Sequence, residues 1–236
     1  MNRRRSLGQH FLISESIAKS IVDSANITKK DIVLEVGTGK GILIPLLCQA
    51  AKKVISVEKD RERYLQALEK FSNFSNLSLK QGDGFKLNSD FTVFVSNLPY
   101  SESRKAIEWL MQKDFSHGVI MVQKEFAEKL LSKTGNKNHR AITVLANHCT
   151  KIERIMDVKK SNFSPTPKVD SVVLRLTKTH QISKSIINTV NKLFSYRRKT
   201  VRNVAKQFAV SVDSNQRFED LTDGEIVRLA KQINKN

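Results

Sequence analysis

Apolar and polar positions alternate between two periods along the first three quarters of the chain. Short apolar runs predict buried strands at residues 31–36, 54–57, 77–80, 91–96, 118–122 and 172–176. Apolar residues at helical spacing predict helices at residues 14–26, 42–51, 61–71 and 104–111. This alternation is typical of a parallel sheet covered by helices on both faces, so an α/β fold is expected.

The pattern changes after about residue 177, where the strand-like runs stop. Residues 182–208 and 226–233 show only helical spacing of apolar positions. We therefore expect a sheet domain over residues 1–178 and a small all-helical domain over residues 179–236. The second domain is near the lower limit of size for independent stability, so it is expected to dock against the first.

The charge balance changes this picture from a generic α/β protein to one with a polyanionic partner. Lys and Arg number 41 against 23 Asp and Glu, which gives a net charge of +18. Nucleic acid and an anionic membrane are the two candidate partners. The basic start, with Arg3, Arg4 and Arg5, is not followed by an apolar signal core, so we interpret it as an arm that lies on phosphates.

Cysteine usage and hydropathy indicate a cytoplasmic protein that uses neither metal nor membrane. Cys48 and Cys149 lie far apart in apolar surroundings, which predicts reduced, buried thiols. A zinc site would need more ligands at closer spacing. The sequence has no uninterrupted apolar run near the roughly 18 residues that a membrane-spanning helix requires.

A glycine-rich segment, Glu35-Val-Gly37-Thr-Gly39-Lys-Gly41, lies between a predicted strand and a predicted helix. Glycines let the backbone turn sharply and approach a ligand beside a helix N-terminus. The segment differs from a dinucleotide fingerprint, whose third glycine would replace Ile42. It also differs from a P-loop, which needs Ser or Thr after the lysine. A tight turn without a ligand remains an alternative.

Two acidic residues at the ends of the next strands extend this candidate site. Glu58 lies 21 residues after Gly37, where an acid can accept hydrogen bonds from ribose hydroxyls. Together with the glycines it predicts an adenosine-containing cofactor, either S-adenosylmethionine or a nicotinamide dinucleotide. Asp83 can accept from the amino group of that adenine, with Phe85 nearby, although an ordinary Asp-Gly turn gives the same pattern.

The segment Asn97-Leu98-Pro99-Tyr100 decides the class of reaction. An adenine amino group is a poor nucleophile because its lone pair is delocalised into the ring. The Asn97 side-chain oxygen and the Leu98 carbonyl can accept its two hydrogens and restore nucleophilicity, with Pro99 fixing the backbone. Tyr100 can stack on the base. A turn that ends a strand with a packed Tyr is the alternative.

Two further segments indicate how a nucleic acid is held. Phe163 begins a proline-containing loop and could stack on the second face of an extruded adenine, although a buried Phe in an interdomain loop is nearly as compatible. Residues 192–206 hold six basic residues and no acid, and Lys199, Arg202 and Lys206 are expected to share one helical face. The candidate RNA-binding residues are Arg3, Arg4, Arg5, Lys168, Arg197, Arg198, Lys199, Arg202 and Lys206.

From Leu7-Gly-Gln-His10-Phe-Leu12 to Arg197-Arg198-Lys199, the sequence resembles the ribosomal RNA adenine dimethylases, which include the kasugamycin-resistance enzyme. The resemblance implies a seven-stranded methyltransferase sheet that binds S-adenosylmethionine over residues 1–178, with the basic N-terminal arm, and a helical RNA-binding domain over residues 179–236. It implies transfer of up to two methyl groups to each of two adjacent adenosines near the 3′ end of small-subunit RNA. We further expect a monomer whose partner is the small ribosomal subunit and its RNA, with no membrane partner. It also implies that S-adenosylmethionine is held by His10, Leu12, Gly37, Gly39, Glu58, Asp83 and Asn97.

The sequence departs from the bacterial pattern in ways that look archaeal. His10 stands where bacterial members usually carry Asn, and Glu102 follows Tyr100 in a stretch that is usually Asn-Ile-Ser. Three alternative functions remain: a non-enzymatic ribosome assembly factor, a large-subunit methylase that confers macrolide resistance, and a nicotinamide dehydrogenase. Ile42 and the lack of an evident hydride-transfer acid or base disfavour the last.

Overall fold

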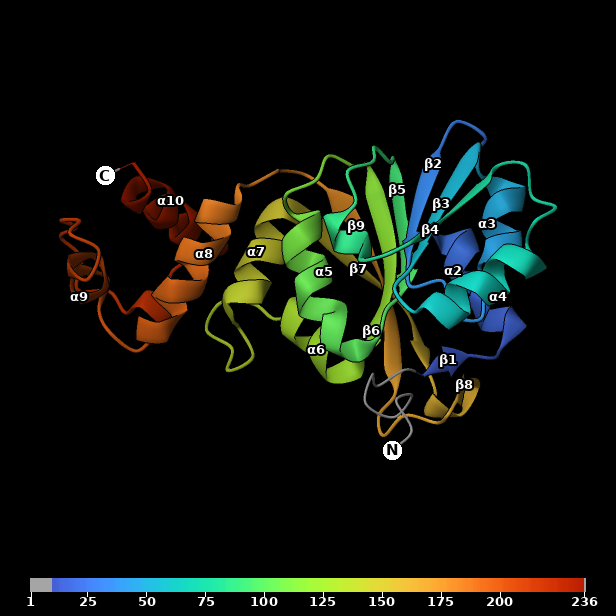
Figure 1. The fold of residues 1–236 in the computed structure, drawn as a ribbon. Helices are drawn as coiled ribbons and strands as arrows, with labels where there is room; N and C mark the ends of the chain where they lie inside the picture. Colours follow the sequence, from blue (N-terminus) through green and yellow to red (C-terminus); the bar gives the residue numbers. More distant parts are fainter. Residues whose placement is uncertain (1–9, 236) are drawn as a thin grey trace. The chain divides into compact units, whose positions relative to one another are not determined.

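The computed structural model describes residues 10–235 and contains a central seven-stranded sheet (Figure 1). In spatial order the strands are β4 (Leu77–Gln81), β3 (Lys53–Glu58), β2 (Ile32–Val36), β5 (Val93–Asn97), β6 (His117–Gln123), β9 (Ser171–Lys178) and β7 (Thr150–Val158). Neighbours from β4 to β6 are parallel, whereas β9 is antiparallel to β6. The predicted α/β class and seven strands are confirmed, but the sheet is mixed, not wholly parallel.

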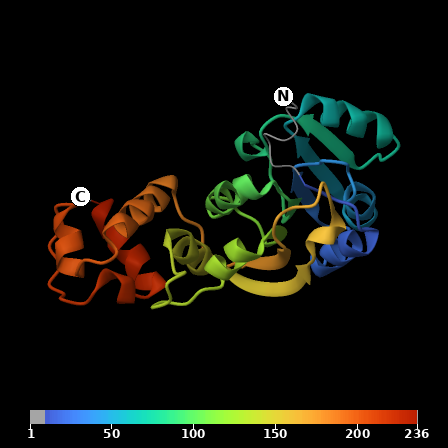
Figure 2. The same ribbon diagram turned by 90° about the horizontal axis from the view of Figure 1, so that it is seen from below.

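A two-stranded ribbon joins distant parts of the chain. β1 (Phe11–Leu12) pairs antiparallel with β8 (Phe163–Ser164), and Leu12 lies opposite Phe163. Figure 2 shows the yellow segment that carries β8 beside the blue N-terminal segment. Two-residue strands are too short to show a hydrophobic period, so the sequence pattern does not predict this pairing.

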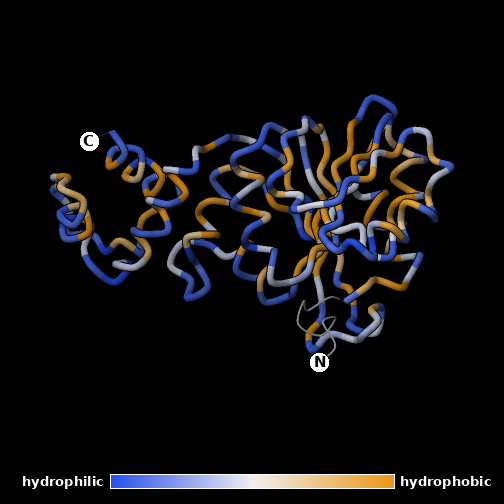
Figure 3. Tube along the Cα trace, viewed as in Figure 1, coloured by the Kyte–Doolittle hydropathy of each residue, from blue (hydrophilic) through white to orange (hydrophobic). Residues whose placement is uncertain are grey.

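The core on one face of the sheet is built from three helices: α2 (Glu15–Ser24), α3 (Ile44–Ala50) and α4 (Arg61–Lys70). Their apolar side chains pack in one buried cluster with those of β2, β3, β5 and β6, and each fully buried side chain of this kind contributes about 1.5–3 kcal/mol. Ser14 and Asp60 begin α2 and α4 by accepting from the backbone N–H three residues on. In Figure 3 the central strands β2, β3, β5 and β6 are mostly orange and the connecting loops mostly blue.

Other helical elements complete the described chain: the α-helices α5 (Ser103–Leu110), α6 (Lys124–Leu130) and α7 (Ala141–Cys149), and the 3-10 turns η1 (Gly84–Lys86), η2 (Tyr100–Glu102) and η3 (Lys160–Asn162). α8 (Lys184–Leu193), η4 (Phe194–Tyr196), α9 (Val201–Lys206), η5 (Phe218–Asp220) and α10 (Asp223–Ile233) follow. Over residues 10–235, the helices are all too short or too polar to cross a membrane.

The contacts divide the chain into two compact units. The first contains the chain up to residue 106 with residues 114–124 and 153–177, and the second contains residues 107–113, 125–152 and 178 onward. Within the second unit, α10 packs against both α7 and α8. The chain enters the second unit for the last time at residue 178, where the sequence predicts a boundary, but two earlier segments also belong to this unit. The assignment of methyl transfer and RNA binding to separate domains stays a prediction.

Substitution of Gly41 tests how tightly the glycine-rich segment is packed. Its φ is +71°, and an added Cβ would lie 2.2 Å from the Phe71 ring. We expect Gly41→Ala to lower the free energy of unfolding by about 2–4 kcal/mol, from left-handed strain and overpacking together. Thermal and urea unfolding measure the loss. Gly135→Ala is the matched control, since its φ is +83° but nothing lies within 4 Å. Equal losses in both variants would contradict the packing argument.

Candidate functional site

Two adjoining cavities lie in the first unit, where β2 and β5 end side by side. In the sheet, β3 and β4 lie next to one edge of β2, whereas β5 and β6 lie next to its other edge. The order of the strands therefore reverses between β2 and β5. In open α/β sheets this crevice is the usual ligand site. The cavities share His10, Gly37, Glu58 and Pro99, and the larger has a volume of about 860 Å³.

The predicted cofactor residues gather around these cavities. The smaller cavity is lined by His10, Leu12, Gly37, Gly39, Glu58 and Asn97, and the larger adds Asp83, Leu98 and Tyr100. The structure therefore brings together all seven residues that the sequence assigns to the cofactor. Their roles toward a ligand stay predictions.

The glycine-rich segment follows β2 in a conformation that favours glycine. Gly37 and Gly39 have φ angles of +88° and +57°. The Gly37 N–H donates to the Val57 carbonyl at 2.8 Å, and a Cβ on Gly39 would lie 3.2 Å from the Phe11 ring. The segment is thus held between the end of β3 and β1, and Gly37 and Gly39 line the smaller cavity.

Glu58 holds this segment in place through its side chain. One carboxylate oxygen accepts from the Gly39 N–H at 2.8 Å, and the other accepts from the Asp60 N–H at 2.9 Å. The residue is buried, with only 5% of its surface exposed. Each oxygen of an ionised carboxylate can accept a second hydrogen bond, so Glu58 can still receive a pair of hydroxyl donors.

Glu35 is a second buried acid at the smaller cavity, and the sequence pattern gives it no role beyond opening the glycine-rich segment. Ser56 donates to its carboxyl group, and the Ser56 and Thr38 hydroxyls lie 2.6 Å apart. Burial raises the pKa of Glu35 to about 8, although the Ser56 hydrogen bond lowers it and the charge of Glu58 raises it further. Glu35 is therefore mainly protonated at neutral pH.

Asp83 is tied to Lys105, a residue that no sequence motif singles out. The Asp83 carboxylate accepts from the Phe85 N–H at 3.0 Å and from Lys105 Nζ at 2.8 Å. The Lys105 ammonium also lies 3.7 Å from Glu102 and 4.8 Å from the centre of the Phe85 ring. This cluster links the loop after β4 to the start of α5 beside the larger cavity.

Replacing Lys105 with Met should raise the pKa of Asp83. Burial alone raises this pKa, but the hydrogen bonds from Lys105 and Phe85 and the nearby charges of Lys105 and Lys59 bring it below the ordinary value. The stabilisation from ionised Asp83 is lost as pH falls through its folded-state pKa, and in the variant this loss should occur at higher pH. Carboxyl-carbon NMR titration measures the shift.

Lys19→Met is the control for this titration, because Lys19 pairs with Asp23 on the exposed face of α2. It should leave the Asp83 titration unchanged. An unchanged Asp83 pKa in Lys105→Met would show that the ammonium group does not set the carboxylate's charge state.

The segment from Asn97 to Tyr100 lies where β5 ends. The Ser96 hydroxyl donates to the Val36 carbonyl and joins β5 to β2 at the point where strand order reverses. Asn97 is half-buried and lines the smaller cavity, whereas Leu98 is buried. The Pro99 carbonyl accepts from the Glu102 N–H at 2.9 Å and closes the turn into η2. The turn places Asn97 and Tyr100 on adjoining cavities.

The predicted stacking residues are not placed face to face. Phe163 is only 2% exposed and belongs to the core cluster, where β8 pairs it with Leu12. The ring stacked on Tyr100 is His10, with centroids 5.7 Å apart and planes inclined by 30°. Stacking of a base on Phe163 stays a prediction, and it would require this side chain to leave the core.

The predicted RNA-binding residues fall in three places. Arg3, Arg4 and Arg5 lie outside the described residues. Lys168 is exposed in the loop before β9, in the first unit. Of the predicted residues in the second unit, Arg197 is half-buried, and the other four, Arg198, Lys199, Arg202 and Lys206, are exposed.

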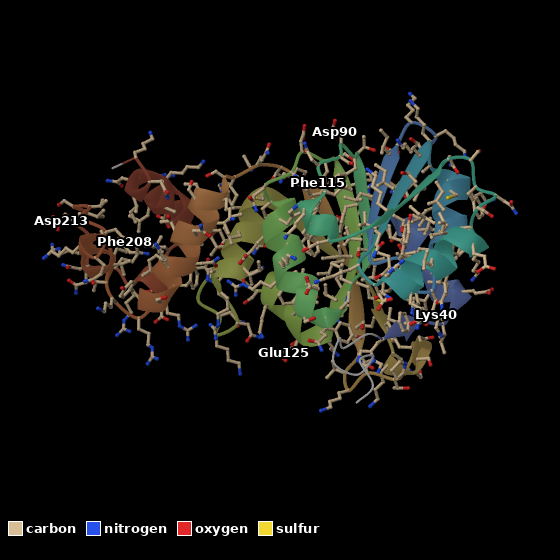
Figure 4. The ribbon with its side chains drawn as sticks, viewed as in Figure 1. Lys40, Asp90, Phe115, Glu125, Phe208 and Asp213 are labelled. Atoms are coloured by element: carbon tan, nitrogen blue, oxygen red, sulfur yellow. The ribbon has the colours of Figure 1, made fainter. Side chains whose placement is uncertain are left out.

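The expectation that Lys199 shares a helical face with Arg202 and Lys206 is wrong. Thr200 caps α9 and bridges to Arg217, so the helix begins only at Val201 and leaves Lys199 in the preceding bend. Arg202 also pairs with Asp213, which Figure 4 labels in the segment after α9. Lys199 therefore lies in a bend, whereas Arg202 and Lys206 lie on the short helix that follows.

The two cysteines are free and buried in the structure. Burial raises the pKa of both thiols to about 11, with a further increase at Cys48 from Glu35, so neither is a ready nucleophile. Residues 10–235 contain no group of three or more His, Cys, Asp or Glu side chains that could hold a metal ion.

Comparison with known proteins gives a consistent result. The family model described as "Ribosomal RNA adenine dimethylase" matches residues 1–235. A "Probable ribosomal RNA small subunit methyltransferase A" of Pyrococcus abyssi is 34% identical over 86% of this chain and 76% of its own length. A "Ribosomal RNA small subunit methyltransferase A" of Thermotoga neapolitana is 34% identical over 96% and 90%, respectively.

Solved structures extend the likeness to the fold. A dimethyladenosine transferase from Plasmodium falciparum superimposes with a TM-score of 0.82 at 28% identity, covering 96% of this chain and 98% of that one. The 23S rRNA methyltransferase ErmE gives a TM-score of 0.68 at 22% identity, covering 95% and 99%. At that identity the second match concerns the fold alone.

Proposed function

Because the chain belongs to the ribosomal RNA adenine dimethylase family, we propose that it dimethylates the exocyclic amino groups of adjacent adenosines near the 3′ end of small-subunit ribosomal RNA. The observation that carries this proposal is the position of Asn97–Tyr100 where two cavities meet at the switch point of the sheet. Two relatives over 30% identical are described as small-subunit methyltransferases, which favours that substrate over large-subunit RNA.

The cavities suit S-adenosylmethionine, the methyl donor that the family implies. The larger volume, about 860 Å³, lies within the range of about 300–1,000 Å³ that is usual for small-molecule sites. Gly37 and Gly39 bring backbone to the cavity lining, where Glu58 can accept from ribose hydroxyls and Asp83 from the adenine amino group. We assign the cofactor to His10, Leu12, Gly37, Gly39, Glu58, Asp83 and Asn97. Bound there, it supplies an electrophilic methyl group.

The residues at the end of β5 activate the target nitrogen without a strong general base. The Asn97 amide oxygen and the Leu98 carbonyl accept the two hydrogens of the adenine amino group, so its lone pair becomes available for attack. Tyr100 stacks on the base, and the rigid end of β5 holds both acceptors at one place. Catalysis on this account is positioning and electrostatic stabilisation. The amino proton becomes acidic after methyl transfer and is lost to solvent.

The charge of the chain supports a large RNA partner. A net charge of +18 favours a phosphate backbone, and the exposed basic residues of the second unit provide contacts beyond the target base. We propose that Lys168, Arg197, Arg198, Lys199, Arg202 and Lys206 hold the small ribosomal subunit, together with the arginines at positions 3–5. We further propose that the chain acts as a monomer in the cytoplasm.

The test uses methyl-labelled S-adenosylmethionine and separated ribosomal subunits that lack adenine dimethylation. Label recovered as dimethyladenosine in small-subunit RNA is the expected result. Label only in large-subunit RNA would overturn the proposed substrate and place the chain with the resistance methylases. Tight binding to subunits without any label would overturn the catalytic role and leave an assembly factor.

A further inference from the structure

Tyr100 is anchored at its far end by a residue from a distant part of the chain. Its phenol oxygen lies 2.7 Å from the hydroxyl oxygen of Ser171, 71 residues further on. Ser171 has no exposed surface, and Tyr100 is half-buried at the larger cavity. The bond therefore joins the loop after β5 to the first residue of β9.

The Ser171 hydroxyl is presented by a rigid part of the fold. Ser171 lies opposite Gln123 in the β6–β9 ladder, next to Asp170. The Asp170 carbonyl accepts from the Lys124 N–H at 3.0 Å, and its carboxylate accepts from the Lys160 N–H at 2.9 Å. Hydrogen bonds therefore hold both the backbone and the side chain of Asp170. Because Ser171 follows directly, its backbone position, and so the origin of its side chain, is well defined.

A second contact restrains the face of the Tyr100 ring. The stacked His10 ring has its Nδ1 atom 2.8 Å from the Pro165 carbonyl oxygen, in the loop that leads to β9. Tyr100 itself lies in η2, a short 3-10 turn after β5. Its ring orientation thus depends on contacts with residues 10 and 171 as well as on its own turn.

We propose that Ser171 is a positioning residue for methyl transfer. Its hydroxyl holds the Tyr100 ring at the inclination that a target adenine needs for stacking beside Asn97, and it acts only through Tyr100. This inference rests on the proposed function, because it gives Tyr100 the target base as its stacking partner. The Tyr100–Ser171 bond itself involves none of the seven cofactor residues, so we expect its loss to affect turnover of RNA rather than affinity for the cofactor.

The experiment breaks the bond from each side in the full chain. Ser171→Ala removes one hydroxyl and Tyr100→Phe removes the other while keeping the aromatic ring. A neutral hydrogen bond contributes a net 0.5–1.5 kcal/mol, so each variant should lower the single-turnover rate on small subunits about twofold to twelvefold. The double variant should lose no more than either single variant, and Ser171→Thr should recover part of the rate.

The controls separate positioning from stability and from the proposed function. Ser72→Ala removes an exposed hydroxyl that bonds the Glu69 carbonyl, and its rate should equal that of the native chain. The affinity for S-adenosylhomocysteine, measured by calorimetry, should stay within twofold in every variant. Fluorescence of 2-aminopurine at the target position should report weaker stacking in Ser171→Ala and Tyr100→Phe.

Two results would overturn the inference while leaving the proposed function in place. One is a native single-turnover rate and native fluorescence in both single variants. The other is a rate loss in Ser171→Ala that disappears when the assay is run well below its melting temperature, with Tyr100→Phe unaffected. Absence of methyl transfer by the native chain would instead overturn the proposed function, and the role of Ser171 with it.

Discussion

Replacing Asn97 with alanine should lower the rate of methyl transfer about 10²–10³-fold and leave affinity for the small subunit nearly unchanged. The magnitude is that of removing one preorganised polar group from a transition state, as for an oxyanion hole. Asn97 is half-buried and closes β5 opposite Met121, a pairing that uses only backbone atoms. Alanine therefore keeps the strand and removes the amide oxygen. Single-turnover assays with saturating cofactor measure the rate.

Asn73→Ala is the matched control for this change, because Asn73 is an exposed amide in the loop after α4. It should turn over at the native rate. Filter binding of both variants to small subunits separates loss of chemistry from loss of affinity. An Asn97→Ala protein that transfers methyl groups within threefold of the native rate would remove Asn97 from the mechanism.

Strands buried on both faces are the part of the fold that the sequence predicts best. β2 and β5 are buried along nearly their whole length, and each begins with three consecutive apolar residues. β7 is not predicted from the sequence because only its two ends are buried, and its middle mixes apolar and charged residues that are exposed or half-buried. α7 escapes for the opposite reason, since most of its residues are buried and it lacks a continuous polar face.

Site residues at the ends of strands can be predicted from the sequence, whereas site residues that depend on a distant partner cannot. Glu58, Asp83 and Asn97 end or follow parallel strands, and such positions meet at one edge of the sheet whatever the details of packing. Lys105 and Ser171 act through partners 22 and 71 residues away, so their pairing carries no local signal.

Replacing Glu35 with Gln should flatten the dependence of stability on pH. The pKa of Glu35 is about 8 in the folded chain, against an ordinary value of 4.5 in the unfolded chain. Between these values the unfolded chain has released the proton and the folded chain has not, so the free energy of unfolding falls by about 1.4 kcal/mol per pH unit. The stability from neutral Glu35 is complete below pH 4.5 and is lost by about pH 8.

Gln is neutral at every pH in this range, and its carbonyl oxygen can accept from Ser56 as the acid does. Relative to the native chain, Glu35→Gln should therefore gain on the order of 4 kcal/mol between pH 4.5 and 8 in urea unfolding. Asp31 and Asp83 have lowered pKa values and make stability rise with pH, but both proteins share them, so they cancel in the difference. Glu69→Gln, at an exposed position of α4, is the control. Parallel pH profiles for the native chain and Glu35→Gln would mean that Glu35 is ionised in the folded protein, with its charge balanced inside the cavity.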